Sequence, residues 1–273
     1  MYRKLHMCWI VLSIIALTIF AYYLNSFRRK STYVWKPLAN ISFVPRIFHF
    51  ISVEPFLKDS EKISEDVTSI INDWKIKNVD FEVIVWTGNK IKNEFPILAD
   101  LLKKLPVSAW IANIVRYKVL YEYGGLYLDT DVMAIRSVQP LLTQFHSGFV
   151  VCAKPRTTNL MIAGPCKIIG NAVIASTKHS ILMKRVFEKS VYLTAKYLPT
   201  IDTANFSYYK GKRVSGPILL TNEFQKSEIP VVGSITFFPC DWTDRSKCVY
   251  SRFLNESKII YGMHQWKQRW GNI

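Results

Sequence analysis

The chain has 273 residues, of which 49% are hydrophobic and 14% aromatic. This content suffices for one large globular domain and excludes an intrinsically disordered chain. Its 36 Lys and Arg residues against 20 Asp and Glu give a net charge of +16, which suits a phosphate-bearing ligand, an anionic membrane surface or nucleic acid. No zinc-finger spacing or arginine-rich arm accompanies this charge, so we do not expect a nucleic-acid partner.

The first apolar segment, residues 7–24, contains no charged residue. A helix of this length spans about 27 Å, which matches the hydrocarbon core of a thin early-secretory bilayer. A cleaved signal peptide is the alternative, but no A-x-A cleavage site follows, so we expect an uncleaved signal-anchor. Residues 1–6 are then a cytoplasmic tail and residues 25–43 a stem without periodic structure.

Basic residues flank the apolar segment on both sides, so charge alone does not fix its orientation. Three N-x-S sequons follow it, at Asn40, Asn205 and Asn255, and they favour a lumenal C-terminal part. We therefore expect a single-pass type II protein of the Golgi or ER membrane.

Four cysteines follow the anchor: Cys152, Cys166, Cys240 and Cys248. In a lumenal domain an even number permits two disulfides, and Cys152–Cys166 with Cys240–Cys248 is the simplest of three pairings. Buried free thiols are the alternative. The absence of a CxxC motif argues against a structural zinc site.

Strand and helix patterns alternate after the stem. "RIFHFIS" (residues 46–52) predicts a short strand, and Asp59 or Ser60 could cap a helix whose apolar face ends at Trp74. "FEVIVW" (residues 81–86) predicts a second, buried strand. This order is typical of the parallel part of an α/β sheet.

The next helix is predicted over residues 111–123, with an apolar stripe and a Gly124-Gly125 terminator. Asn113 and Arg116 lie three residues apart, so they share a face beside that stripe. The segment "LYLD" follows as a strand, and another amphipathic helix is predicted over residues 180–193. The C-terminal third is rich in loops and aromatic residues.

The segment "YGGLYLDTDV" places Asp129 and Asp131 at the end of a predicted strand. Side chains two apart on a strand project to the same side, and ligands bind at the carboxyl ends of strands in α/β folds. Two close carboxylates stay ionised only beside a counter-charge, which Mg²⁺ or Mn²⁺ could supply together with phosphate oxygens. The alternative is a turn in which both side chains cap backbone amides.

The span "WIANIVRYKVLYEYGGLYLDTDV" (residues 110–132) resembles a DxD glycosyltransferase family. That family contains fungal initiating α-mannosyltransferases, inositolphosphoceramide mannosyltransferases and animal α-1,4-galactosyl- and N-acetylglucosaminyltransferases (glycosyltransferase family 32-like). Further segments resemble the family in the same order: "VPRIFHFIS", "VIVWT", "NAVIASTKHSIL", "SGPILLT" and "YGMHQWKQRW".

The resemblance implies an α/β fold of GT-A type over residues 44–273, a Rossmann-like mixed sheet flanked by helices. It implies retaining transfer of a hexose from a nucleotide sugar to a glycolipid or glycan, with Mn²⁺ or Mg²⁺. The implied catalytic residues are Asp129, Asp131 and Arg116. The implied metal ligands are Asp131, Asp129 and His264, the last from a C-terminal His-x-Trp motif.

The implied donor-binding residues are Asn113, Arg116, Asp129, Trp86, Asn171, Trp266 and Trp270. Packing is the alternative role for His264 and both C-terminal tryptophans. Many family members have Asp where this chain has Asn113, which leaves the donor open among GDP-mannose, UDP-galactose, UDP-GlcNAc and UDP-glucose. A non-catalytic carbohydrate- or lipid-binding protein with the same fold is the alternative function.

Overall fold

The structure, a computed structural model, describes residues 43–53, 63–155, 166–200, 208–225, 227, 229–240 and 258–266. The predicted tail and anchor, nearly all of the stem, the three sequons, Cys248 and Trp270 lie outside these residues. All described residues belong to one unit, residues 42–273. Among them there is no helix with the length and hydropathy that crossing a bilayer requires.

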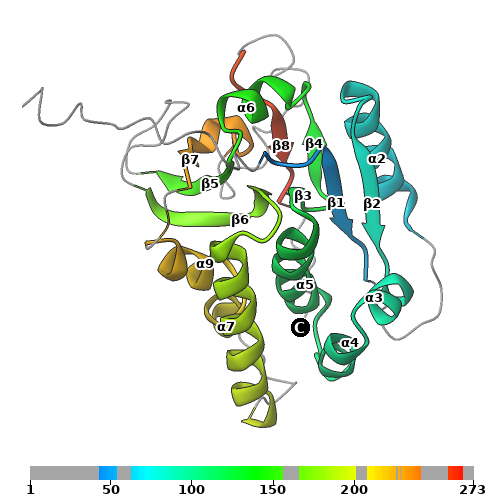
Figure 1. The fold of residues 1–273 in the computed structure, drawn as a ribbon, viewed down its shortest axis with the longest axis vertical. Helices are drawn as coiled ribbons and strands as arrows, with labels where there is room; N and C mark the ends of the chain where they lie inside the picture. Colours follow the sequence, from blue (N-terminus) through cyan, green and yellow to red (C-terminus); the bar gives the residue numbers. More distant parts are fainter. Residues whose placement is uncertain are drawn as a thin grey trace, which may run out of the picture. The chain divides into compact units, whose positions relative to one another are not determined.

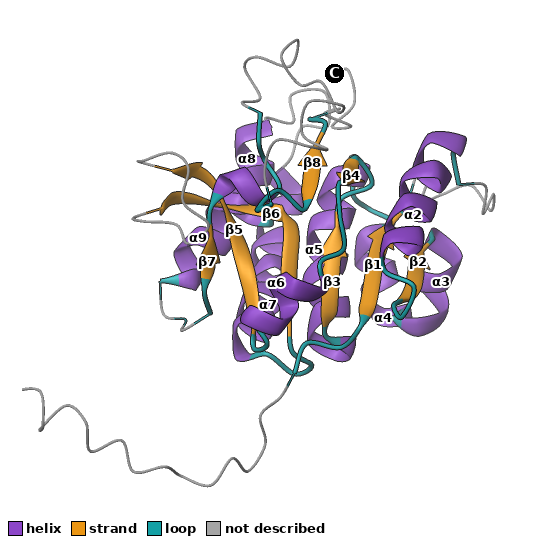
Figure 2. Cartoon of the chain, turned by 90° about the horizontal axis from the view of Figure 1, so that it is seen from above, coloured by secondary structure: helices purple, strands orange, loops and turns teal. Residues whose placement is uncertain are grey.

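A six-stranded mixed sheet has the strand order β2-β1-β3-β6-β5-β7, which Figure 2 shows edge to edge. Its strands are β1 (Ile47–Ile51), β2 (Glu82–Trp86), β3 (Gly125–Leu128), β5 (Gly148–Pro155), β6 (Cys166–Ser176) and β7 (Val231–Val232). Strands β2, β1 and β3 are parallel, as the sequence predicted for the first two strands of the chain, whereas β6 is antiparallel to both β3 and β5. The predicted mixed α/β sheet is therefore confirmed.

Helices cover both faces of this sheet (Figure 1). One apolar cluster packs the sheet against α3 (Gly88–Glu94), α4 (Pro96–Leu102), α5 (Ser108–Tyr123), α7 (Ile181–Tyr197) and α9 (Pro217–Phe224). A second cluster on the opposite face involves α2 (Glu65–Lys77) and α6 (Gln139–Gln144). Strand β1 shows how the sequence divides between them: Phe48 and Phe50 enter the second cluster, while Ile51 enters the first, because side chains alternate along a strand.

The remaining described elements lie outside this sheet. Strands β4 (Val132–Ala134) and β8 (Gly262–His264) form an antiparallel pair, and α8 (Tyr208–Val214) precedes α9. Single turns of 3-10 helix occur at Leu198–Thr200 and Ser234–Thr236.

Two predicted helices begin elsewhere than the sequence indicated. Helix α2 starts at Glu65, after Ser64, and its predicted apolar face through Trp74 is buried. Helix α5 starts at Ser108, three residues before the predicted boundary. Side chains of α5 are buried well beyond the predicted stripe, since the helix lies between the sheet and α7.

The predicted disulfide Cys152–Cys166 is present and ties β5 to β6. Cys240 also takes part in a disulfide, and its predicted partner, Cys248, lies outside the described residues.

Candidate functional site

The turn from α5 into β3 depends on two glycines. Gly124 and Gly125 have φ angles of 66° and 98°, a backbone region that side chains with a Cβ disfavour. A Cβ on Gly125 would lie 2.6 Å from the backbone oxygen of Ile47, so β3 could not approach β1 so closely. The turn thus folds α5 back onto the sheet and brings Arg116 beside the end of β3.

The DTD segment is a turn, which corrects the prediction that Asp129 continues the strand. Strand β3 ends at Leu128, and the amide of Val132 donates to the carbonyl of Asp129 at 3.0 Å. The amide of Asp129 bonds Ala172 of β6 at 2.8 Å, and the amide of Gln265 bonds the carbonyl of Asp131 at 2.9 Å. The two carboxylates therefore come together through a backbone turn held by β6 and the chain after β8.

His264 joins the two carboxylates because Val132 of β4 pairs with it across the antiparallel ladder. Its Nε2 lies 3.2 Å from Oδ1 of Asp131 and 3.8 Å from Oδ2 of Asp129. One ligand atom of each of the three residues lies within 4.8 Å of the others. The predicted metal ligands thus converge, although His264 follows Asp131 by more than 130 positions.

Arg116 holds the other side of Asp129. Its Nη1 donates to Oδ1 of Asp129 at 3.0 Å and to the carbonyl of Asn171, and its Nε donates to the carbonyl of Ala112 at 3.2 Å. The hydroxyl of Tyr127 donates to the same Asp129 oxygen at 2.6 Å, and its ring lies under the guanidinium. In the described part of the chain no group bonds Nη2 of Arg116, which leaves that nitrogen for a ligand.

The electrostatics of the cluster are those of a cation site. Burial opposes the charge on His264, but the carboxylates of Asp131 and Asp129 outweigh it and raise its pKa to about 9. Burial likewise opposes charge on Asp129, but Arg116 and His264 together lower its pKa. The proton on His264 therefore supplies positive charge where a metal ion could supply it.

The donor set also fits such an ion. Two carboxylate oxygens and one imidazole nitrogen suit Mn²⁺ better than Mg²⁺, which prefers oxygen ligands and water. Nδ1 of His264 is buried without a hydrogen-bond partner among the described residues.

An uncharged polar group lies next to this charged cluster. Nδ2 of Asn171 donates to Oδ1 of Asn113 at 2.9 Å, and Nδ2 of Asn113 donates to the hydroxyl of Ser215 at 3.3 Å. Asn113 is only 2% exposed, and each of its polar atoms already has a partner. Direct contact of Asn113 with a sugar, predicted from the resemblance, therefore does not fit this structure, whereas half-buried Asn171 remains accessible.

The predicted tryptophans are not all at the site. Trp86 is completely buried, its indole N–H bonds Nδ1 of His49 at 3.0 Å, and Phe95 stacks on its ring. This corrects its prediction as a donor-binding residue, because the β2 strand directs it into the core. Trp266 does lie at the site, with its ring edge-on to that of His264 at 4.2 Å.

Sequence reasoning missed Tyr127 and Ser215. Tyr127 lies two positions before Asp129, so the strand periodicity could have placed it on the same side. Ser215 begins the segment "SGPILLT", which resembles the family, but no local signal in that segment indicates a contact with Asn113.

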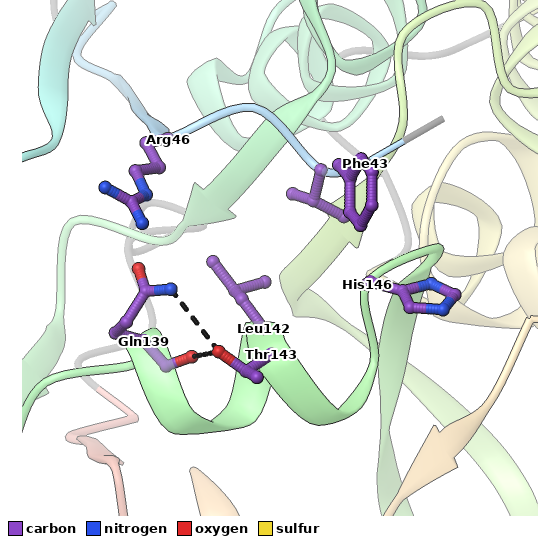
Figure 3. Close-up of a pocket in the computed structure, with 7 residues that line it drawn as sticks. Phe43, Arg46, Gln139, Leu142, Thr143 and His146 are labelled. Carbon is purple, nitrogen blue, oxygen red and sulfur yellow. Dashed lines mark hydrogen bonds between the residues drawn. The ribbon is translucent and has the colours of Figure 1, made fainter. Parts of the chain in front are cut away.

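A cavity of about 310 Å³ lies elsewhere in the fold. It is lined by Phe43, Val44, Arg46, Gln139, Leu142, Thr143 and His146. Figure 3 shows Gln139 bonded to Thr143 on α6, across from Arg46. Arg46 precedes β1, whereas the carboxylates follow β3, which runs parallel to β1. The cavity and the carboxylates therefore lie at opposite ends of these strands.

Comparison with known proteins also relates the central region of the chain to glycosyltransferases. Residues 64–147 match the family described as "Glycosyltransferase sugar-binding region containing DXD motif". Inositol phosphoceramide mannosyltransferase 3 of Schizosaccharomyces pombe is 36% identical over 67 residues, 23% of this chain and 19% of that protein. Inositol phosphoceramide mannosyltransferase 1 of the same yeast is 24% identical over 190 residues, 67% of this chain and 52% of that protein.

Two solved structures were also similar. They are the PaToxG glycosyltransferase (17% identity, TM-score 0.45, 68% of this chain and 70% of that one) and apo GlyE of Streptococcus pneumoniae (12% identity, TM-score 0.45, 82% and 55%). The chain spans about half or less of the length of the two yeast relatives. The family and sequence matches confirm the predicted resemblance to DxD glycosyltransferases, and the matched region contains Asn113, Arg116, Asp129 and Asp131.

Proposed function

We propose that this chain is a metal-dependent glycosyltransferase that moves a hexose from a nucleotide sugar to a glycolipid or glycan. The observation that carries the proposal is the convergence of Asp129, Asp131 and His264 beside Arg116. The two carboxylates and the arginine come from the family-matching region, and the histidine comes from a segment outside it.

Asp131, Asp129 and His264 would hold Mn²⁺. When bound, such an ion supplies positive charge to the departing nucleoside diphosphate. The imidazole of His264 must be neutral to act as a ligand, so metal binding releases the proton that it holds in the metal-free protein.

Arg116 has two tasks in this proposal. Its bonds to Asp129 and to the carbonyl of Asn171 hold both groups in one orientation. Its Nη2 is left to donate to the diphosphate or to a sugar hydroxyl, and a guanidinium keeps its charge when buried. Burial opposes that charge, but the adjacent Asp129 carboxylate outweighs it and raises the Arg116 pKa.

The GT-A type of the fold, retention at the sugar carbon and the membrane location belong to the same proposal. The family resemblance supports the first two. The apolar segment 7–24 supports a type II anchor, and disulfide bonding at Cys152–Cys166 and at Cys240 supports a lumenal Golgi or ER location.

A donor screen tests the proposal. The full chain, purified in detergent, is incubated with GDP-mannose, UDP-galactose, UDP-GlcNAc and UDP-glucose, with and without Mn²⁺. We expect Mn²⁺-dependent hydrolysis of at least one donor, lost in Asp131→Asn and kept in Asp100→Asn, which removes an exposed carboxylate on α4. Binding of a sugar or lipid without turnover of any donor would instead support a non-catalytic protein.

A further inference from the structure

The uncharged group beside the metal ligands is built from three separate elements. Asn113 lies on α5, Asn171 on β6, and Ser215 in the turn between α8 and α9. Asn113 and Ser215 are 2% and 0% exposed. Neither side chain can reach a ligand, so Asn113 and Ser215 act on the site through Asn171.

The hydrogen bonds in this group have one direction. The Ser215 hydroxyl donates to the carbonyl of Gly211 at 3.5 Å, and a carbonyl can only accept. Ser215 must then accept from Nδ2 of Asn113, which turns Oδ1 of Asn113 towards Asn171. Asn171 in turn must present its Nδ2 to Asn113, so its Oδ1 faces away from the group.

The other end of the chain of bonds lies at the charged cluster. Asn171 is half-buried, and its backbone carbonyl accepts from Nη1 of Arg116, which also bonds Asp129. The Asn171 side chain is therefore the member of the group that a ligand beside Arg116 can contact.

We propose that Ser215 and Asn113 are positioning residues that orient Asn171, so that Asn171 Oδ1 accepts from one hydroxyl of the donor's sugar and helps to select that sugar. This inference rests on the proposed function. A sugar hydroxyl suits this end of the site because it can donate to an amide oxygen. Sites that hydrogen-bond a substrate hydroxyl reject analogues that lack it or hold it elsewhere, because buried polar groups are then left unpaired.

The first test examines the hydrogen bonds from Ser215 to Asn171 and does not depend on enzyme activity. The full chain is labelled with ¹⁵N-asparagine, and the side-chain amide signals of Asn113 and Asn171 are assigned with the variants Asn113→Gln and Asn171→Gln. We expect Ser215→Ala to shift both signals. Ser190→Ala is the matched control, because Ser190 is also fully buried and donates to a helix carbonyl, that of Phe187, away from the site.

The second test reads sugar selection. Discrimination is measured as kcat/KM for the best donor divided by kcat/KM for a hydroxyl epimer of that donor. We expect Ser215→Ala to lower this discrimination about 5- to 10-fold, the effect of one neutral hydrogen bond. Affinity for the nucleoside diphosphate without sugar stays within about 2-fold of wild type. Ser215→Cys, which keeps the volume and loses most of the hydrogen bond, gives the same result if Ser215→Ala does not fold.

The outcomes separate this inference from the function on which it rests. Unchanged Asn113 and Asn171 signals in Ser215→Ala overturn the bond chain even in an active enzyme. Wild-type epimer ratios in Ser215→Ala overturn the sugar contact. A wild-type chain that hydrolyses no donor overturns the proposed function and the sugar contact together, while the amide signals still decide the bond chain.

Discussion

His49 and His264 are both buried, at 0% and 7% exposure, but they belong to different kinds of region. His49 sits in β1 among paired groups: its Nδ1 accepts from the Trp86 indole at 3.0 Å, and its Nε2 donates to the Gly124 carbonyl at 2.7 Å. Burial lowers the pKa of His49 to about 4. This imidazole stays neutral and joins β1, β2 and the glycine turn.

His264 has the opposite surroundings. Its Nε2 faces two carboxylates, its Nδ1 has no partner in the described part of the chain, and its pKa is raised to about 9. Burial alone therefore does not distinguish a packing histidine from a functional one. Unpaired atoms and unbalanced charge make that distinction, and they occur around His264 and not around His49.

The largest effect is expected on turnover, from a substitution in the charged cluster around His264. Asp131→Ala removes a metal ligand, so Mn²⁺-dependent donor hydrolysis should fall by a factor of about 1,000 or more. The fold should persist, because the loss of the Asp131 contact with His264 is offset by relief of the repulsion between two carboxylates in the metal-free protein. Donor hydrolysis and circular dichroism measure both; near-normal Mn²⁺-dependent turnover would show that the metal assignment is wrong.

A substitution of His49 should lower the stability of the fold rather than turnover. His49→Leu leaves the Trp86 N–H and the Gly124 carbonyl buried without partners, which should lower the free energy of unfolding by about 2 to 4 kcal/mol. Turnover of the remaining folded protein should stay within about 3-fold of wild type. Urea unfolding and kinetics on the same sample measure the two quantities, and a stable variant with lost turnover would place His49 in the site instead.

A smaller effect is expected at Arg116. Arg116→Lys keeps the charge but loses the planar fork whose donors point at Asp129, Asn171 and a ligand in fixed directions, so turnover should fall about 10- to 100-fold, or ~1.4 to 2.8 kcal/mol. Steady-state kinetics with the best donor measure this loss. Wild-type rates in this variant would mean that the arginine only balances the charge of Asp129.

The smallest effect expected is on stability against pH in the metal-free protein. The raised pKa of His264 gives stability that is complete below about pH 6.5 and is lost as pH rises through about 9. The lowered pKa of His49 gives stability that is present above about pH 6.5 and is lost as pH falls through about 4. Stability should therefore be highest near pH 6.5 and fall on the order of 1 to 2 kcal/mol towards pH 5.5 and 8.5.

Urea unfolding at several pH values measures this profile. His264→Gln should remove the alkaline limb and His49→Leu the acid limb. A flat profile in the wild-type chain would contradict the opposite electrostatics of the two regions.

The sequence predicted those parts of the fold that depend on local patterns. The strands β1 and β2, the buried face of α2 and the turn after α5 follow from apolar periodicity and two glycines. The meeting of Asp129 with Arg116 followed from the family resemblance, because both residues belong to one short motif.

The rest depends on contacts between distant segments. His264 reaches Asp131 only through the β4–β8 ladder, and local periodicity does not reveal that pairing. The same is true of Ser215, whose bond to Asn113 spans 102 positions. Trp86 was misplaced because its strand could not be assigned an inner and an outer face from sequence, and the structure turns it towards His49 and Phe95.

Binding of Mn²⁺ to the full chain, followed by electron paramagnetic resonance, tests the central claim most directly. The account predicts that the wild-type chain binds one Mn²⁺ ion, that Asp131→Asn loses this binding, and that Asp100→Asn keeps it. A wild-type chain that binds no Mn²⁺, or an Asp131→Asn variant that binds it as tightly as wild type, would contradict the account.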